Sequence, residues 1–289
     1  MNKKRILITG KGSYVGTSFI KWLKQCPNQY EVEELSVRGT TWTEYDFSSY
    51  DTVLHVAGIA HVSTDPKMEE QYYKVNRDLT IEVAEKAKKN KVKQFIFMSS
   101  IIVYGDSSSG EKVIDRSTIP KPSNFYGKSK LQAEEGIKSL ESDTFKIVII
   151  RPPMIYGKYS KGNYVKLSQF ARKLPVFPDY NNKRSMLYIE NLCEFLKLMI
   201  DNFERGLFFP QNSEHVQTSE MVKFIAEAHM KRIRLTRIFN PLLKIAFTKV
   251  GIVNKVFGNL FYEQTISEYK ENYRVLNLRD SIIATEVER

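Results

Sequence analysis

A short apolar run followed at once by a glycine-rich turn opens the chain, and no other stretch limits the possible fold as strongly. Residues 5–9, Arg-Ile-Leu-Ile-Thr, have the length and composition of a buried parallel strand. Three glycines fall within the next seven residues, and an amphipathic helix with Phe19 on its apolar face follows. In this order the glycines let the backbone approach a diphosphate, and the helix N-terminus supplies amide donors. The stretch therefore predicts a dinucleotide site. We expect its cofactor contacts to come from Gly10, Gly12, Ser13, Tyr14, Val15 and Gly16.

Short apolar runs alternate with helical patterns through about the first 155 residues. Further strands are predicted at residues 30–37, 51–58, 93–98 and 145–150, and a long charged helix is predicted from Glu69 to Asn90. Such alternation is typical of an α/β fold with a doubly wound parallel sheet and helices on both of its faces.

After Tyr156-Gly157 the pattern becomes less regular and richer in lysine, glycine and proline. We therefore expect a dinucleotide-binding domain at residues 1–155 and a smaller C-terminal α/β substrate lobe at residues 156–289. Residues 185–205 combine a short strand pattern with an apolar helix, and we expect them to return to the first domain.

The ends of the second and third predicted strands carry candidate ligand contacts. Arg38 follows the second strand, where an acidic residue binds the ribose of NAD and an arginine accommodates the 2′-phosphate of NADP. We therefore favour NADP over NAD. Ala57 and Gly58 end the third strand, where small residues let a ligand approach the backbone. His55 is interpreted as a core residue of that strand, whereas His61 lies beyond it and is a candidate substrate contact.

A tyrosine and a lysine stand four residues apart near the start of another predicted helix. This spacing places Tyr126 and Lys130 on one helical face. A tyrosine with its ordinary pKa of about 10 is a poor acid or base at neutral pH, and a neighbouring cation lowers that value. The pair predicts a tuned acid/base, although an ordinary helix start with a tyrosine and two lysines remains an alternative. A serine at the end of strand 93–98, Ser99 or Ser100, could hold a substrate oxygen.

Composition limits the cellular location and the class of ligand that this protein can have. The two cysteines, Cys26 and Cys193, are far apart and belong to no motif, which favours a reduced, cytoplasmic protein without a metal site. No apolar run reaches the roughly 20 residues that cross a bilayer, and the first run is too short for a signal peptide. The formal net charge of +11 suits an anionic ligand or surface, but no nucleic-acid recognition motif accompanies it.

Residues 238–261 interleave apolar side chains with Lys244, Lys249 and Lys255. A basic amphipathic segment of this kind can contact an anionic membrane from one side. We favour a pair of helices packed on the second lobe instead, because Gly251 and Gly258 interrupt the run.

Seven motifs, spread in order over nearly the whole chain, resemble the extended short-chain dehydrogenase/reductase family, in its nucleotide-sugar epimerase/dehydratase branch. They are Ile8-Thr9-Gly10 with Gly16, His55-Val-Ala-Gly58, Asn76, Met98-Ser-Ser-Ile-Ile-Val-Tyr104-Gly105, Tyr126-Gly-Lys-Ser-Lys130, Arg151-Pro152 with Tyr156-Gly157, and Arg184 before Tyr188-Ile189.

The resemblance implies a Rossmann enzyme with Tyr126 as general acid/base, and with Lys130 binding the nicotinamide ribose and lowering the pKa of the tyrosine. It assigns the catalytic serine to Ser100 rather than Ser99, and it assigns Arg184 to the diphosphate of a UDP-sugar. It also adds Pro153 to the cofactor contacts. The expected substrate contacts are His61, Ser100, Met154, Asn163 and Arg184. Family members pair through helices that correspond to residues 69–90 and 124–140, so a homodimer is expected.

The chain departs from the family pattern at three positions. Ser13 replaces the middle glycine of the turn, Met154 replaces an asparagine, and Arg38 stands where an acidic residue is usual. These departures put the local phosphate turn, one substrate contact and the choice of cofactor in question.

The reaction is expected at C4 of the sugar. Residues 145–157 and 173–178 resemble a subgroup from capsule and exopolysaccharide clusters of Gram-positive bacteria, whose members look like reductases of UDP-linked 4-keto-2-acetamido-2,6-dideoxyhexoses. We therefore favour reduction of a C4 ketone by NADPH. C4 epimerisation of a UDP-hexose with retained NAD is the nearest alternative, and a cofactor-sensing regulator without activity is a more distant one. A 4,6-dehydratase is less favoured, because Ile101 and Ile102 stand where that chemistry requires Asp-Glu. A lipid-linked donor remains open.

Overall fold

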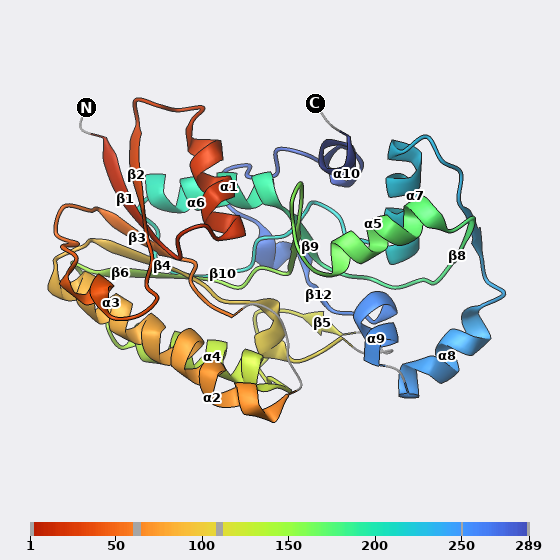
Figure 1. Ribbon diagram of the computed structural model, residues 1–289, viewed down its shortest axis with the longest axis horizontal. Helices are drawn as coiled ribbons and strands as arrows, with labels where there is room; N and C mark the ends of the chain where they lie inside the picture. The colour runs from red at the N-terminus through yellow and green to blue at the C-terminus, as the bar shows by residue number, and fades with distance from the viewer. Residues whose placement is uncertain (1–2, 60–64, 108–111, 250, 288–289) are drawn as a thin grey trace. The chain divides into compact units, whose positions relative to one another are not determined.

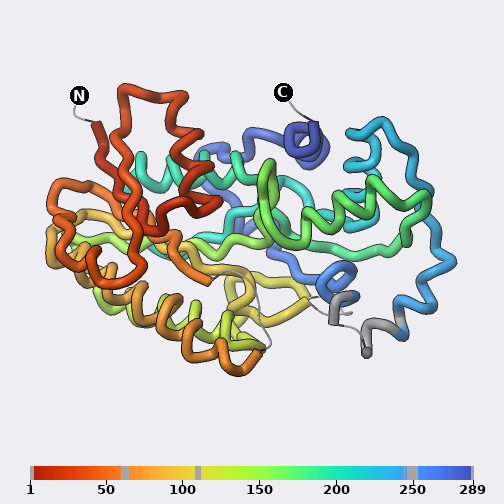
Figure 2. Tube along the Cα trace, in the orientation of Figure 1, coloured from red at the N-terminus to blue at the C-terminus, as the bar shows by residue number. Residues whose placement is uncertain are grey.

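The computed structural model describes residues 3–59, 65–107, 112–249 and 251–287, and His61 lies outside them. The chain forms two compact units. The first unit is built from three stretches whose traces can be followed in Figure 2, namely residues 1–105, 120–152 and 192–209. The second unit contains residues 106–119, 153–191 and 210–289.

Six parallel strands form the sheet of the first unit, in the order β10-β6-β4-β3-β1-β2. Their bounds are β1 Lys4–Thr9, β2 Tyr30–Leu35, β3 Thr52–His55, β4 Gln94–Met98, β6 Lys146–Ile150 and β10 Gly206–Phe208. Because β1 pairs with β2 on one side and with β3 on the other, the winding of the sheet reverses at β1. Ligands of doubly wound sheets bind at the carboxyl ends of the strands beside such a reversal. The predicted α/β Rossmann fold is confirmed.

Helices cover both faces of this sheet, with α1 and α6 on one face and α3 and α4 on the other (Figure 1). Their bounds are α1 Tyr14–Leu23, α3 Leu79–Lys89, α4 Phe125–Lys138 and α6 Ile189–Asp201. The strands read as continuous apolar runs because both faces are buried. Val53 and Phe95, for example, lie in one core cluster with Ala84 of α3 and Ala133 of α4.

The long helix predicted at residues 69–90 is not one regular helix. It consists of α2 (Glu69–Tyr72), a π-helical turn (Tyr73–Asp78) and α3. Such π turns are rare and occur often at functional sites, and this one carries the buried Asn76. Short 3-10 turns occupy residues Thr41–Glu44, Pro66–Met68, Ile101–Tyr104 and Gln264–Ser267.

The second unit contains three short parallel strand pairs, β5 with β12, β7 with β9 and β8 with β11. The strands are β5 Val113–Ile114, β7 Met154–Tyr156, β8 Val176–Pro178, β9 Met186–Tyr188, β11 Arg234–Thr236 and β12 Phe261–Tyr262. The helices are α5 Asn163–Lys173, α7 Thr218–Ala228, α8 Asn240–Lys249, α9 Gly251–Phe257 and α10 Leu278–Glu286. In the part of the chain that the structure describes, every helix is too short or too polar to cross a membrane.

Candidate active site

The turn between β1 and α1 lies against the loop that follows β3. Gly10 has a φ of +117°, and a Cβ at this position would lie 2.7 Å from the backbone nitrogen of Ala57, so the turn requires glycine here. At Gly12 a Cβ would meet no atom within 4 Å. The turn therefore leaves open space beside the N-terminus of α1, as a bound diphosphate requires.

Ser13, which replaces the expected glycine, caps this helix. Its Oγ accepts a hydrogen bond of 3.2 Å from the amide of Gly16. Serine is among the preferred residues at such an N-cap. A Cβ at Gly16 would lie 2.7 Å from the same oxygen. The departure at Ser13 thus has a local structural reason, and Gly16 gives it room.

Glu34 is a residue of this site that sequence analysis missed. Its Oε1 accepts a hydrogen bond of 3.0 Å from the amide of Gly12. Glu34 lies within β2, one residue before its end, whereas Arg38 lies beyond β2 and is exposed. A carboxylate therefore does stand near the glycine turn. The sequence offered no signal for it, because the contact depends on the alignment of β2 with β1.

His55 at the end of β3 is fully buried. Its Nδ1 lies 2.7 Å from the hydroxyl of Thr9 and its Nε2 lies 3.1 Å from the hydroxyl of Thr80. Burial lowers the pKa of His55 to about 3, so the ring stays neutral near pH 7. The interpretation of His55 as a core residue is confirmed.

Tyr126 lies in the first turn of α4, and its position follows from the cap of that helix. Asn124 is the N-cap, and its side-chain oxygen accepts a hydrogen bond of 2.9 Å from the amide of Gly127. The Tyr126 side chain is hydrogen-bonded to Ser100 and packs edge-on against Tyr72, with ring centroids 5.9 Å apart. The structure therefore brings Ser100, rather than Ser99, to Tyr126.

Burial raises the pKa of Tyr126 to about 12, the Tyr72 phenol acts in the same direction, and the Ser100 hydrogen bond opposes them. The pKa of Tyr126 is thus raised rather than lowered in this structure, and Lys130 is not among the groups that shift it. Desolvation of the phenolate outweighs any help that it receives, so the phenol of Tyr126 is protonated near pH 7.

Lys130 is buried one helical turn after Tyr126. Its Nζ donates a hydrogen bond of 2.8 Å to the carbonyl of Met98 and lies 4.6 Å from the centroid of the Phe97 ring. Burial lowers the pKa of Lys130 to about 8. A Cβ at Gly58 would lie 3.3 Å from Nζ, so this predicted cofactor residue lies directly beside the lysine.

A buried ion pair joins Arg151 to Glu134, which lies on α4 four residues after Lys130. The guanidinium binds both carboxylate oxygens, with Nε–Oε1 at 2.9 Å and Nη2–Oε2 at 2.5 Å. Nη1 donates to the hydroxyl of Tyr104 at 2.7 Å, and the Ser99 hydroxyl also donates to Glu134. This network occupies Ser99 and leaves Ser100 for Tyr126. Glu134 was missed, although its place four residues after Lys130 on the same helical face was the available signal.

Asn76, noted above only as a motif residue, joins two parts of the site. Its side-chain oxygen accepts a hydrogen bond of 2.8 Å from the amide of Ile59, and its Nδ2 donates to the Ser129 hydroxyl at 3.2 Å. Through these bonds the π turn fixes the loop after β3 to helix α4. The positions of Gly58 and Lys130 therefore depend on Asn76.

The predicted substrate residues of the second unit lie together. Met154, Asn163 and Arg184 line a small cavity of about 10 Å³, which also contacts Lys255. Nη1 of Arg184 donates to the carbonyl of Gly258 at 3.1 Å, and burial lowers the pKa of the guanidinium to about 10. Two cations at one cavity suit an anionic group. Pro153, assigned above to the cofactor, is buried in this unit.

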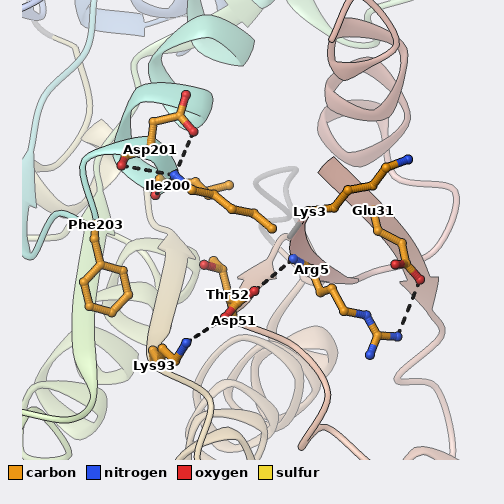
Figure 3. Close-up of a pocket in the computed structure, with 10 residues that line it drawn as sticks. Lys3, Arg5, Glu31, Asp51, Thr52, Lys93, Ile200, Asp201 and Phe203 are labelled. Carbon is orange, nitrogen blue, oxygen red and sulfur yellow. Dashed lines mark hydrogen bonds and ion pairs between the residues drawn. The ribbon is translucent and has the colours of Figure 1, made fainter. Parts of the chain in front are cut away.

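A much wider cavity, of about 770 Å³, lies at the opposite edge of the first unit's sheet, beside the amino ends of β1, β3 and β4 (Figure 3). Six of its seven charged side chains form ion pairs: Lys4 with Asp201 at 3.0 Å, Lys93 with Asp51 at 2.9 Å, and Arg5 with Glu31 at 3.5 Å. The size of this cavity does not make it the active site, because the acid/base residues lie at the carboxyl ends of the strands.

Comparison with known proteins identifies relatives over most of the chain. Residues 6–208 match the model of the NAD dependent epimerase/dehydratase family. A UDP-glucose 4-epimerase of Vibrio cholerae is 31% identical, with 93% of this chain and 89% of that protein covered. An N-acetyl-α-D-glucosaminyl-diphospho-ditrans,octacis-undecaprenol 4-epimerase of Escherichia coli O157:H7 is 28% identical, with 89% and 82% covered.

A solved structure supports the fold independently. The UDP-glucuronic acid 4-epimerase of Bacillus cereus, in complex with NAD, superposes with a TM-score of 0.72 at 17% identity, covering 98% of this chain and 97% of that one. At that identity the likeness concerns the fold alone. The family match over residues 6–208, the relative at 31% identity and the six-stranded sheet agree, and the chain belongs to the NAD-dependent epimerase/dehydratase family, the nucleotide-sugar branch of the extended short-chain dehydrogenases/reductases.

Proposed function

We propose that this protein carries out oxidation and reduction at C4 of a UDP-hexose, with Tyr126 as the proton-transferring residue. The observation that carries the proposal is the hydrogen bond between Tyr126 and Ser100, one helical turn from the buried Lys130. These three groups combine an acid, a donor for a sugar oxygen and a cation.

The residues around the glycine turn fit a nicotinamide dinucleotide. Gly12 leaves open space for a diphosphate at the N-terminus of α1, Gly10 lets that turn lie close to Ala57, and Gly58 lies directly beside Nζ of Lys130, which we assign to the ribose. When bound, the nicotinamide supplies hydride acceptance and donation. The residues proposed to hold it are Gly10, Gly12, Ser13, Tyr14, Val15, Gly16, Arg38, Ala57, Gly58, Tyr126, Lys130 and Pro153.

Proton transfer is the task of Tyr126. Ser100 donates a hydrogen bond to the oxygen on C4, and Tyr126 exchanges a proton with that oxygen. A phenol with a pKa of about 12 is ready to donate. To accept a proton it must first lose its own, and Lys130 is the nearby cation that can stabilise the phenolate.

The reaction that we now favour is 4-epimerisation. The two curated relatives that match about nine-tenths of this chain are both 4-epimerases by name, which reverses the order of the two candidates drawn from the sequence. In an epimerase Tyr126 removes the hydroxyl proton as a C4 ketone forms, and returns a proton when the ketone is reduced on its other face.

Reduction of a UDP-4-keto-2-acetamido-2,6-dideoxyhexose is the second candidate. Two observations favour it. The phenol of Tyr126 is in the protonated form that a reductase requires, and the exposed Arg38 beyond β2 suits the 2′-phosphate of NADP. Glu34 at the glycine turn opposes that cofactor preference, since its carboxylate would repel an added phosphate.

The proposal also includes the substrate contacts, the oligomeric state and the cellular location of the protein. In the second unit Arg184 binds the sugar-nucleotide diphosphate, with Met154 and Asn163 beside it in the cavity, while His61 remains a candidate contact. The protein is a homodimer through residues 69–90 and 124–140, which light scattering can test. It works in the cytoplasm in capsule or exopolysaccharide synthesis.

The test compares both reactions on the same purified protein. The epimerase assay follows the conversion of UDP-glucose and UDP-N-acetylglucosamine into their C4 epimers without added cofactor. The reductase assay follows NADPH and NADH absorbance after addition of the 4-keto-6-deoxy substrate. Epimer formation together with nucleotide released from the denatured protein supports the epimerase, whereas ketone-dependent loss of reduced cofactor supports the reductase.

The variant Tyr126→Phe should reduce either activity by about a hundredfold or more, since general acid/base catalysis contributes roughly 10²–10⁴. Tyr159→Phe is the matched control, because Tyr159 is 81% exposed and takes no part in the site. Full activity of Tyr126→Phe would overturn the assignment of the acid/base.

A further inference from the structure

The second unit carries a long stretch without any carboxylate side chain. Residues 228–262 contain no Asp or Glu, although the chain has 33 in 289 residues and a stretch of this length would hold about four on average. The same stretch holds seven basic residues, Lys231, Arg232, Arg234, Arg237, Lys244, Lys249 and Lys255. The stretch is therefore strongly cationic.

Apolar side chains are exposed within this cationic stretch. Ile238 is 81% exposed, Leu242 is 66% exposed and Ile245 is 60% exposed. Leu242 and Ile245 are three residues apart and so lie on one side of α8, and Ile238 lies in the turn directly before that helix. Phe239, between Ile238 and Leu242, is 40% exposed. A contiguous exposed apolar strip usually marks an interaction surface.

The packing interpretation of residues 238–261 holds for only one of the two helices. In α9 the side chain of Phe257 is buried, with its ring 5.7 Å from that of Phe177 and 5.8 Å from that of Tyr180. Helix α8 instead leaves Leu242 and Ile245 exposed, and Figure 1 draws it at the margin of its unit. Leu242 and Ile245 therefore take no part in the packing that was expected of this helix pair.

We propose that the strip of Ile238, Phe239, Leu242 and Ile245, with the exposed cations Arg232, Arg234 and Arg237 beside it in the chain, binds the surface of an anionic phospholipid bilayer. The apolar side chains enter the boundary between headgroups and acyl chains, and the guanidinium groups bind lipid phosphates. Arg237 also forms an exposed ion pair with Asp179, with Nε and Oδ2 3.1 Å apart.

Charge complementarity favours a bilayer over a second copy of this chain. A twofold-symmetric dimer would set the strip against itself. The cations of each copy would then face those of the other, and residues 228–262 offer no carboxylate to pair with them. An anionic surface neutralises the same groups and attracts each of them, by about fivefold in partition per Lys or Arg.

The experiment is flotation of the full chain with vesicles of phosphatidylcholine alone or of phosphatidylcholine with phosphatidylglycerol. We expect binding only to the anionic vesicles, weakened by salt. Arg232→Gln with Arg234→Gln should weaken partition by about 25-fold, at fivefold per cation. Ile238→Asn with Leu242→Asn should weaken it by about tenfold or more. These side chains are exposed, and circular dichroism checks that the variants fold.

Lys21→Gln with Lys24→Gln is the matched control. It removes two exposed cations, one in α1 and one at its C-cap, and should leave vesicle binding within about twofold to threefold. The proposal fails if anionic vesicles do not bind at low salt. It also fails if the control weakens binding as much as the Arg232/Arg234 variant, since net charge alone would then explain it. Loss of a dimer in the Ile238/Leu242 variant, without vesicle binding by the parent, would assign the strip to self-association. The inference does not rest on the proposed reaction, because the assay contains no sugar nucleotide.

Discussion

Replacing Lys130 with methionine should make the cofactor-free protein relatively more stable near neutral pH and relatively less stable at alkaline pH. Folding buries the ammonium of Lys130 and lowers its pKa from 10.5 to about 8. Below pH 8 both the folded and the unfolded chain hold this proton, and the folded chain bears the desolvation cost of the charge. Between pH 8 and 10.5 the unfolded chain binds more protons, so the free energy of unfolding of the parent rises with pH.

The magnitude follows from the size of the shift. A change of about 2.5 units, at about 1.4 kcal/mol per unit, corresponds to roughly 3 kcal/mol. The difference in unfolding free energy between the parent and Lys130→Met should therefore change by roughly 3 kcal/mol between pH 7.5 and pH 10.5, in favour of the parent. Loss of the hydrogen bond to Met98 adds a term that is the same at every pH.

Urea unfolding at a series of pH values measures this difference. Tyrosines that ionise above pH 10 affect both proteins equally and cancel in the subtraction. Lys138→Met, which removes an exposed lysine from the last turn of the same helix, should show a difference independent of pH. A difference for Lys130→Met that stays constant within about 0.5 kcal/mol from pH 7.5 to 10.5 would refute the argument that burial controls the charge of Lys130.

Three further predictions follow from the same site. Arg151→Met leaves the buried Glu134 carboxylate without its guanidinium and should lower the free energy of unfolding by about 3–5 kcal/mol. The double variant Glu134→Gln with Arg151→Met should recover part of that loss, and urea unfolding of both variants measures the difference. Gly10→Ala should cost at least about 2 kcal/mol in thermal unfolding, because its Cβ would meet the backbone of Ala57, whereas Gly39→Ala, where φ is also positive but space is open, should cost only about 1 kcal/mol. Arg38→Ala should weaken NADP binding by about tenfold or more and leave NAD binding unchanged in calorimetric titration, and equal losses for both would remove Arg38 from the 2′-phosphate site.

Local patterns predicted those parts of the fold that depend on neighbours in the chain. The apolar runs gave the buried strands, because a parallel sheet covered on both faces needs continuous apolar segments. The helix expected at residues 124–140 begins where it was predicted, and its N-cap Asn124 contacts an amide only three residues away. The i, i+4 spacing placed Tyr126 and Lys130 on one face of that helix. The resemblance selected Ser100 over Ser99, and the hydrogen bond of Tyr126 agrees with that choice.

Properties that depend on distant contacts could not be read from the sequence. The rise in the pKa of Tyr126 comes from burial and from Tyr72, which is 54 residues away in the chain. The bond between Glu34 and Gly12 depends on the register of β2 against β1. The π turn at Asn76 interrupts a stretch whose composition suits a regular helix throughout.

The assembly of the first unit from three separate stretches has a consequence for synthesis on the ribosome. Strand β10 and most of α6 belong to residues 192–209, so the sheet lacks an edge strand and one covering helix until those residues emerge. At 5–20 residues per second, the 57 residues between positions 152 and 209 take roughly 3–11 s to add. During that time the edge of β6 and the apolar face beneath α6 are open to wrong strand partners. The nascent chain therefore passes through an interval in which chaperone binding would be most useful, and a fragment that ends near residue 155 would remain in that state.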